Sequence, residues 1–297
     1  MPTLAAGDHQ FFVDHDGRRR SYLVHVPAEA APAKAPPVVL NFHGGGGNAA
    51  GQKSYSRMDE ASERHGFIAV YPEGTGGVLG KLHTWNAGNC CGYAMENKVD
   101  DVGFTVALLD DLAARTSIDR RRIYATGLSN GAMMAYRLAA ERSDRIAAIA
   151  AVAGGMVIDA FGPSRAVPIV HIHSVDDPRA LYDGGLGAPF PFTSKRVNHP
   201  PVEDTIGRWI SFDRCPTQAA ASPTLRGKSS DAGNTATKYV YGPCSGGTEV
   251  VLWKLTGSGH VWPGGVRDRY KRLLGRSTHV IDANEEMWEF FARFTLP

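Results

Sequence analysis

Short runs of apolar and β-branched residues alternate along the chain with stretches in which apolar residues recur every three or four positions. The first pattern is typical of buried strands, and the second of helices that bury one face. One such run, VVLNF at residues 38–42, leads directly into a histidine and four glycines. The predicted strands are residues 38–42, 68–71, 123–126, 169–173 and 248–255, and the predicted helices are residues 100–115, 132–141 and 284–294.

The alternation of strands and helices predicts an α/β fold, in which a mostly parallel central sheet carries helices on both faces. With 297 residues, of which 43% are hydrophobic, the chain can bury one large core. We therefore expect residues 1–297 to form a single domain. The Ala- and Pro-rich segment 28–37 is short for an interdomain linker and indicates a surface connection between early strands.

Charge and hydropathy narrow the classes of partner. The formal net charge is only +2, so we expect no nucleic-acid partner. Arg18, Arg19 and Arg20 form a short basic run that we expect in a solvated turn. No run approaches the roughly 18 consecutive apolar residues that a membrane span requires, and the first residues lack the pattern of a signal peptide. We expect no membrane partner.

The sharpest chemical signal is Gly127-Leu128-Ser129-Asn130-Gly131, which lies between a predicted strand and a predicted helix. This placement is typical of a nucleophile elbow, a tight turn that exposes a serine. Small residues two positions before and after the serine are needed because the turn leaves no room for a β-carbon. Ser129 is therefore the candidate nucleophile, and the following helix would direct its N-terminus toward a developing anion.

A serine hydroxyl needs a base, and the base needs a carboxylate to orient it. His260 lies in a glycine-flanked loop after the last predicted strand, and we predict that it is the base. Asp177 follows the strand 169–173, where the acid loop of this fold belongs. Its neighbour Asp176 is the alternative; we favour Asp177 because Pro178 would fix the turn around it.

An oxyanion hole completes the predicted machinery. The candidates are the backbone N–H groups of Asn130, directly after the nucleophile, and of Gly44 or Gly45, after the first predicted strand. Without side chains, the glycine amides can approach an alkoxide closely. A phosphate-binding loop is disfavoured because no Lys-Ser or Lys-Thr follows the glycines.

Other histidines offer a competing interpretation. His171 and His173 lie two apart on a predicted strand, so they point to the same side and could join Asp176 around a metal ion. We favour two hydrogen-bonded core histidines and predict no metal. His199 and His279 have no supporting context in the sequence.

Together these segments resemble the esterases of the polyhydroxybutyrate depolymerase family, which includes feruloyl and acetyl xylan esterases. The resemblance covers roughly residues 10 to 295. It is carried by HGGGGN, YPEGT, WNAGNCCGYA, VDDVGF, YATGLSNGAMMAYRLA, HIHSVDDP and GSGHVWPGG. It implies a secreted or periplasmic serine hydrolase without a cofactor, and it places the triad on Ser129, Asp177 and His260.

The resemblance also suggests walls for the substrate site. Trp85 and Trp262 fall in segments expected near its mouth, where an indole could contact an aromatic acyl group or a polymer; each could equally be a packing residue. We interpret residues 181–201 as a loop insertion beside the acid, with Phe190 and Phe192 as further candidate walls. Many relatives have glycine and alanine where this chain has Ser174 and Asp176.

The positions of the cysteines suggest one disulfide bond. Cys215 and Cys244 flank a polar stretch that we expect to be a loop, and related esterases carry similar paired cysteines, so we predict a disulfide between them. Relatives often carry a cysteine in the helix after the nucleophile, where this chain has Ala139 and Ala140. The partners of Cys90 and Cys91 therefore stay open.

These observations predict a serine carboxylic ester hydrolase that acts through an acyl-enzyme. We expect short-acyl or hydroxyacyl esters in polyesters of the polyhydroxybutyrate or polylactate type as substrates. Feruloyl or acetyl esters of plant polysaccharides are the alternative. An alternative of another class is a non-catalytic, polymer-binding protein with the hydrolase fold.

Overall fold

A computed structural model describes residues 3–28, 35–77, 80–189 and 196–297. In this part of the chain, one large sheet has the strand order β1-β2-β4-β3-β5-β6-β7-β13-β12-β10, and β11 also pairs with β12. Its strands are β1 (Gly7–His15), β2 (Arg18–Val26), β3 (Val38–Phe42), β4 (Ile68–Pro72), β5 (Ile123–Leu128), β6 (Ala148–Val152), β7 (Ile169–Ser174), β10 (Ala220–Ala221), β11 (Leu225–Arg226), β12 (Thr235–Tyr241) and β13 (Val250–Thr256).

The centre of the sheet, from β4 through β13, is parallel, whereas the strands beyond it on both sides are antiparallel. A second, two-stranded sheet pairs β8 (Gly185–Leu186) with β9 (Asn198–His199). The helices are α1 (Ala49–Ser56), α2 (Met58–His65), α3 (Gly92–Glu96), α4 (Asp101–Arg115), α5 (Asn130–Glu141), α6 (Val202–Phe212), α7 (Lys271–Leu274) and α8 (Ala283–Phe291), with short 3₁₀ turns at Ser229–Asp231 and Ser245–Gly247.

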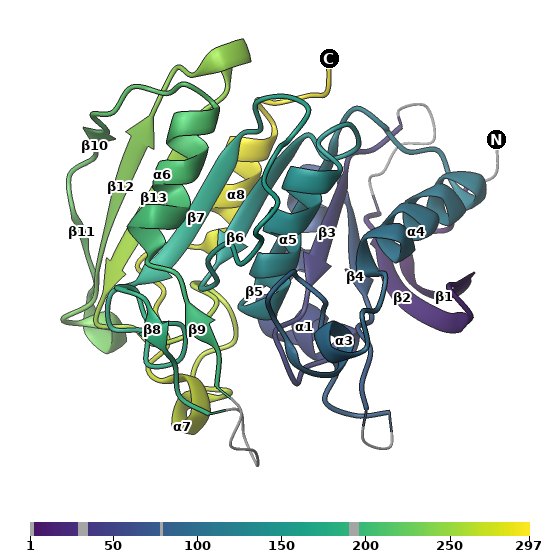
Figure 1. Ribbon diagram of the computed structural model, residues 1–297, viewed down its shortest axis with the longest axis horizontal. Helices are drawn as coiled ribbons and strands as arrows, with labels where there is room; N and C mark the ends of the chain where they lie inside the picture. Colours follow the sequence, from purple (N-terminus) through teal and green to yellow (C-terminus); the bar gives the residue numbers. More distant parts are fainter. Residues whose placement is uncertain (1–2, 29–34, 78–79, 190–195) are drawn as a thin grey trace.

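Helices cover both faces of the sheet. In Figure 1, α4, α5 and α6 lie in front of it and α8 lies behind it. Because successive side chains of a strand point to opposite faces, Val38 and Leu40 of β3 pack in the front core, whereas Val39 packs in the rear core. The predicted α/β architecture is confirmed, and the central strands are buried on both faces, as a parallel sheet requires.

Two local expectations are corrected. The helix predicted to begin at residue 132 begins at Asn130, directly after the serine. The basic run is not a solvated turn: it begins β2, and only Arg19 is exposed. The Arg20 side chain is buried and donates to Asp101 at 2.8 Å, because an arginine inside a protein needs a carboxylate partner.

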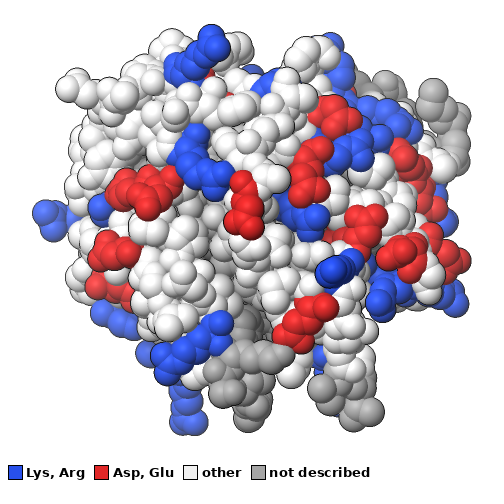
Figure 2. All heavy atoms as spheres, in the orientation of Figure 1, with Lys and Arg blue, Asp and Glu red and all other residues white. Residues whose placement is uncertain are grey.

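The distribution of charged side chains on the surface agrees with the small net charge. Figure 2 shows acidic and basic side chains intermixed across the visible face. Among the described residues, no helix combines the length and the apolar character needed to cross a bilayer.

Candidate active site

Ser129 stands at the sharp junction between β5 and α5. Its backbone has φ 58° and ψ −118°, a positive-φ conformation that is strained for a residue with a side chain. The flanking glycines make the turn possible. A β-carbon on Gly127 would collide with the backbone of Gly131, and one on Gly131 would collide with the carbonyl oxygens of Phe42 and His43. The geometry is therefore that of a nucleophile elbow.

Asp177 and His260 are brought together from loops that follow β7 and β13. Nδ1 of His260 donates to Oδ2 of Asp177 at 2.7 Å, and both side chains are buried. Oδ1 of Asp177 accepts the backbone N–H groups of Arg179 at 2.7 Å and Ala180 at 2.9 Å. Since Nδ1 of His260 carries the proton, Nε2 is left as the acceptor, which is the tautomer that a general base requires.

The Asp177 carboxyl is held ionised. Burial raises its pKa, but the charge of His260 and hydrogen bonds from His173 and His260 outweigh burial and bring the pKa below its ordinary value. The carboxylate can therefore stabilise a cationic His260 during a reaction.

Asp176 has a different position from its neighbour. Its Oδ2 accepts the backbone N–H of Gly257 at 2.7 Å, and its side chain is exposed. Asp176 thus holds the start of the loop that carries His260, while Asp177 contacts the imidazole itself.

The glycine-rich loop after β3 faces the serine. Gly44 and Gly45 line the same cavity as Ser129 and His260, and a β-carbon on Gly44 would lie 3.5 Å from Cβ of Ser129. Asn130 opens α5, and its side-chain amide is occupied, since it donates to the carbonyl of Trp85 at 3.0 Å and accepts the Trp85 N–H at 2.7 Å. Its main-chain N–H is the group left to act at the serine.

Both tryptophans that we expected at the mouth of the site lie instead in the core, at 0% and 1% exposure. The indole N–H of Trp85 donates to the carbonyl of His43 at 2.9 Å, so this residue supports the glycine-rich loop after β3. The indole of Trp262 donates to Asn284 at 3.1 Å. Neither is among the described residues that line the cavity, so both have the packing role that the sequence left open. Phe190 and Phe192 lie outside the described residues.

A cavity of about 630 Å³ opens around Ser129. Its wall residues lie in loops and in α1, α3, α5, α7 and β9, at the carboxyl ends of the parallel strands (Figure 1). The sequence prediction missed most of these residues, because they carry no motif and gather only through the fold. They are Gln52, Tyr55, Thr84, Tyr93, Glu96, Met133, Arg179, Val197, His199, Tyr270, Leu273 and Leu274.

His199 is the most unexpected wall residue. Its Nδ1 is buried without a hydrogen-bond partner, and burial, with a smaller effect of the His260 charge, lowers its pKa to about 4. His199 is therefore a neutral imidazole near the base.

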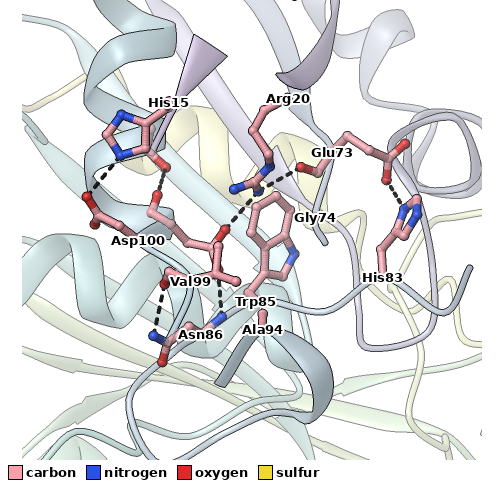
Figure 3. A network of polar contacts seen from close by, with 12 residues as sticks. His15, Arg20, Glu73, Gly74, His83, Trp85, Asn86, Ala94, Val99 and Asp100 are labelled. Atoms are coloured by element: carbon pink, nitrogen blue, oxygen red, sulfur yellow. Dashed lines mark hydrogen bonds and ion pairs between the residues drawn. The ribbon is translucent and has the colours of Figure 1, made fainter. Parts of the chain in front are cut away.

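A buried polar network shapes the loops behind the serine (Figure 3). Arg20 donates to Asp101 and, at 2.9 Å, to the carbonyl of Glu73. Asp101 in turn accepts the backbone N–H of Asn86 at 2.8 Å, next to Trp85. Burial raises the Glu73 pKa, but the nearby His43 ring and the hydrogen bond from His83 at 2.7 Å outweigh it and bring the pKa to about 2. The network ties β2, α4 and the loop carrying Trp85 to one another.

Two clusters among the described residues have the composition of metal ligands: His43, Glu73 and His83, and Asp8, His25 and Asp59. Hydrogen bonds already occupy both ring nitrogens of His43, with Gly44 O at 2.8 Å and Gly74 N at 3.0 Å. Lys53 donates to both aspartates of the second cluster. Both clusters are thus satisfied as polar networks.

The metal set considered from the sequence is not assembled either. Nε2 of His171 lies 2.9 Å from Nδ1 of His173 in a direct hydrogen bond. Both rings are buried, whereas the Asp176 carboxylate is exposed and binds Gly257. The core interpretation of the two histidines agrees with this arrangement.

The structure joins Cys215 to Cys244 in the predicted disulfide, and it joins the adjacent Cys90 and Cys91 to each other. Cys91 lines the cavity and Cys90 is buried beside it. The pairing that the sequence left open is therefore local.

Comparison with known proteins identifies the family. The family model described as esterase PHB depolymerase matches residues 20–194, which is more than half of the chain. The chain belongs to this esterase family. This esterase is thus a carboxylic ester hydrolase, and the family resemblance seen in the sequence is confirmed.

Relatives of this esterase agree with the assignment. It is 29% identical over 281 residues to NocK of Nocardia uniformis subsp. tsuyamanensis, covering 92% of this chain and 79% of that protein. It is 28% identical to feruloyl esterase B of Piromyces equi, over 94% of this chain and 46% of that enzyme. It is 27% identical to the bifunctional acetylxylan esterase/xylanase XynS20E of Neocallimastix patriciarum, over 82% of this chain and 31% of that enzyme. The chain thus spans less than half of the length of the last two.

Solved structures support the fold. An acetyl xylan esterase from Aspergillus awamori superposes with a TM-score of 0.61 at 16% identity, covering 96% of this chain and 99% of that one. A dienelactone hydrolase-like phosphotriesterase, P91, superposes with a TM-score of 0.58 at 14% identity, covering 98% and 100%. At these identities the likeness establishes the α/β-hydrolase fold alone.

Proposed function

We propose that this esterase hydrolyses its substrates through an acyl-enzyme formed on Ser129, with His260 as general base and Asp177 as the acid that orients it. The observation that carries the proposal is the 2.7 Å hydrogen bond from Nδ1 of His260 to Asp177, in a cavity that Ser129 and His260 both line. An imidazole in this tautomer can take the serine proton on Nε2.

In the proposed mechanism, Oγ of Ser129 attacks the ester carbonyl carbon while its proton passes to Nε2 of His260. The main-chain N–H groups of Asn130 and of Gly44 or Gly45 bind the oxyanion. His260 then protonates the leaving alcohol, and the acyl group stays on Ser129. A water molecule, deprotonated by His260, attacks this ester and releases the acid.

The proposed substrates are short-acyl or hydroxyacyl esters in polyesters. A long acyl chain gains affinity by burying methylenes, at about 0.8 kcal/mol each, and needs an extended apolar groove. The cavity here is a space of about 630 Å³ whose wall combines apolar side chains, such as Val197 and Leu273, with Tyr93 and Arg179. In this proposal the cavity holds a short acyl group, and the bulky, partly polar alcohol stays outside it.

A second candidate is the removal of feruloyl or acetyl groups from plant polysaccharides. The names of the relatives from Piromyces equi and Neocallimastix patriciarum favour it. Tyr55, Tyr93 and Tyr270 on the cavity wall could contact a feruloyl ring or a sugar face.

The mechanism is tested by labelling with a fluorophosphonate, followed by peptide mapping. We expect the label on Ser129, and we expect S129A to remain folded while its turnover falls by roughly six orders of magnitude. S129A activity within about tenfold of wild type would refute the mechanism. In that case another residue would be the nucleophile. A folded wild-type protein that hydrolyses no ester would instead favour the non-catalytic, polymer-binding alternative.

Substrate choice is tested by kcat/KM on p-nitrophenyl butyrate and palmitate, together with product release from hydroxybutyrate and lactate polymer films, methyl ferulate and acetylated xylan. We expect butyrate to exceed palmitate and soluble acids to appear from the films. Release from ferulate or xylan but not from the films would assign the second candidate.

A further inference from the structure

A chain of buried side chains runs from the helix behind Ser129 to the carboxylate of Asp177. The hydroxyl of Tyr136, on α5, lies 2.8 Å from Nδ1 of His171, on β7. Nε2 of His171 lies 2.9 Å from Nδ1 of His173. Nε2 of His173 lies 2.8 Å from the carbonyl of Ala180 and 3.3 Å from Oδ2 of Asp177. The mechanism proposed above uses none of these three side chains.

The carbonyl of Ala180 determines which atom donates in each hydrogen bond of this series. The carbonyl of Ala180 can only accept, so Nε2 of His173 carries a proton. In a neutral ring its Nδ1 must then accept, and the donor is Nε2–H of His171. Nδ1 of His171 accepts in turn, from the hydroxyl of Tyr136. The tautomers of His173 and His171 are therefore both determined by this series of hydrogen bonds, which begins at the carbonyl of Ala180 and ends at the hydroxyl of Tyr136.

Burial keeps two members of this chain of side chains neutral. All three side chains are at most 2% exposed. Burial, and secondarily His173, bring the pKa of His171 well below its ordinary value, and burial raises the pKa of Tyr136. Their hydrogen bonds leave the Nε2–H of His173 on the side of Ala180 and Asp177.

We propose that His173 is a positioning residue of the active site: its Nε2–H, which donates to the carbonyl of Ala180 on the acid loop, also faces Oδ2 of Asp177 at 3.3 Å and keeps this oxygen toward Nδ1 of His260. Tyr136 and His171 keep the ring of His173 in the tautomer that can donate. This inference rests on the proposed function, because it acts through Asp177 and His260. It also gives a physical link between α5, which begins beside Ser129, and the acid loop.

The expected effect on His260 has a definite sign. The titratable groups that face Asp177 are His260 and His173, with His199 of β9 farther away; the Arg179 side chain turns to the carbonyl of Pro189. Without the donor from His173, Asp177 becomes a stronger acceptor for the imidazolium of His260. We expect the acid limb of the kcat/KM profile to move to higher pH as a result.

Two matched variants separate positioning from packing. H173N keeps an oxygen where Nδ1 accepts from His171 but has no group that reaches Asp177, whereas H173Q can place an N–H near the position of Nε2. For H173N we expect kcat per titrated active site to fall roughly 10- to 100-fold, with KM little changed. We expect the acid-limb midpoint to rise by about half a pH unit. H173Q should restore most of both.

The background of D177N tests whether the effect passes through the acid. There, H173N should change kcat by less than about threefold, because the carboxylate that it positions is gone. If H173N does not fold, Y136F should move the acid limb in the same direction by a smaller amount. If the acid-limb midpoint of the kcat/KM profile is unchanged in H173N, the inference is overturned. The same holds for Y136F if H173N does not fold and Y136F is measured in its place. An equal loss in the D177N background would also overturn it. Failure of the serine label in wild type would overturn the proposed function instead.

Discussion

Asp176 and Asp177 are adjacent in the chain, yet their carboxylates hold different parts of one loop. Asp177 accepts the imidazole N–H of His260, and Asp176 accepts the backbone N–H of Gly257, three residues earlier in the chain. One side chain orients the ring, and the other fixes the start of the loop that delivers it.

This division predicts unequal effects of removing the two charges. D177N should lower kcat on the order of 10⁴-fold, because an amide can stabilise the wrong tautomer of His260. D176N should cost less than about tenfold, since it weakens one exposed hydrogen bond. Turnover of p-nitrophenyl butyrate, normalised to active sites, measures both. The opposite ranking would transfer the role of the acid to Asp176.

The disulfide between Cys215 and Cys244 predicts a stability change. It closes a loop with a sequence separation of 29, so the double variant C215A/C244A should lose about 3 to 4 kcal/mol in the free energy of unfolding if chain entropy dominates. Urea denaturation of both proteins without reductant gives the difference. As a control, reductant should lower the free energy of unfolding of the variant much less than that of the wild type. A denaturation midpoint that is the same in both proteins without reductant would contradict the prediction.

The buried pair of Arg20 and Asp101 predicts a larger cost for breaking one partner than for replacing both. R20M should lower the free energy of unfolding by about 3 to 5 kcal/mol, because Asp101 would remain buried without its partner. The double variant R20M/D101L should recover part of the loss. R19M, at the exposed neighbouring position, is the control and should stay within about 0.5 kcal/mol. Equal effects of R20M and R19M would show that the pair contributes little.

Asp213 predicts a pH dependence of stability. Burial raises its pKa to about 7, against weaker opposing effects of the Val167 N–H and Arg165. Since the folded pKa lies above the ordinary 3.8, the folded state binds the proton more tightly. Its contribution to stability is full below about pH 4 and is lost as the pH rises toward 7.

The variant D213N should lack this loss. Its urea midpoint should exceed that of wild type at pH 8, and the difference should shrink as the pH falls to 4. A difference that is constant across this range would show that the carboxyl does not titrate as inferred.

The elements that the sequence predicted correctly are those whose pattern is local. Residues 38–42 and 123–126 are mostly apolar and form strands that are buried along their whole length, and the glycines around Ser129 are dictated by a turn that needs only five residues. The β1–β2 hairpin was missed because its first strand lies at the sheet edge and is only half buried.

The burial of Trp85 and Trp262 could not be predicted, because a motif near the mouth of a site does not say which way an indole points. His199 had no signal either: it lies on a two-residue strand that only the fold brings to the cavity. The choice between Asp176 and Asp177 likewise needed the position of His260 in space.

The candidate site has a modular construction. The segments carrying Gly44, Ser129, Asp177 and His260 all leave the parallel sheet at the carboxyl ends of β3, β5, β7 and β13, whereas the helices on the two faces fill the core. Loop length and composition at that edge can therefore vary without disturbing the packing that keeps the strands in register. A scaffold built in this way is evolvable, since the loops that surround the candidate site can change while the strands beneath them keep their places.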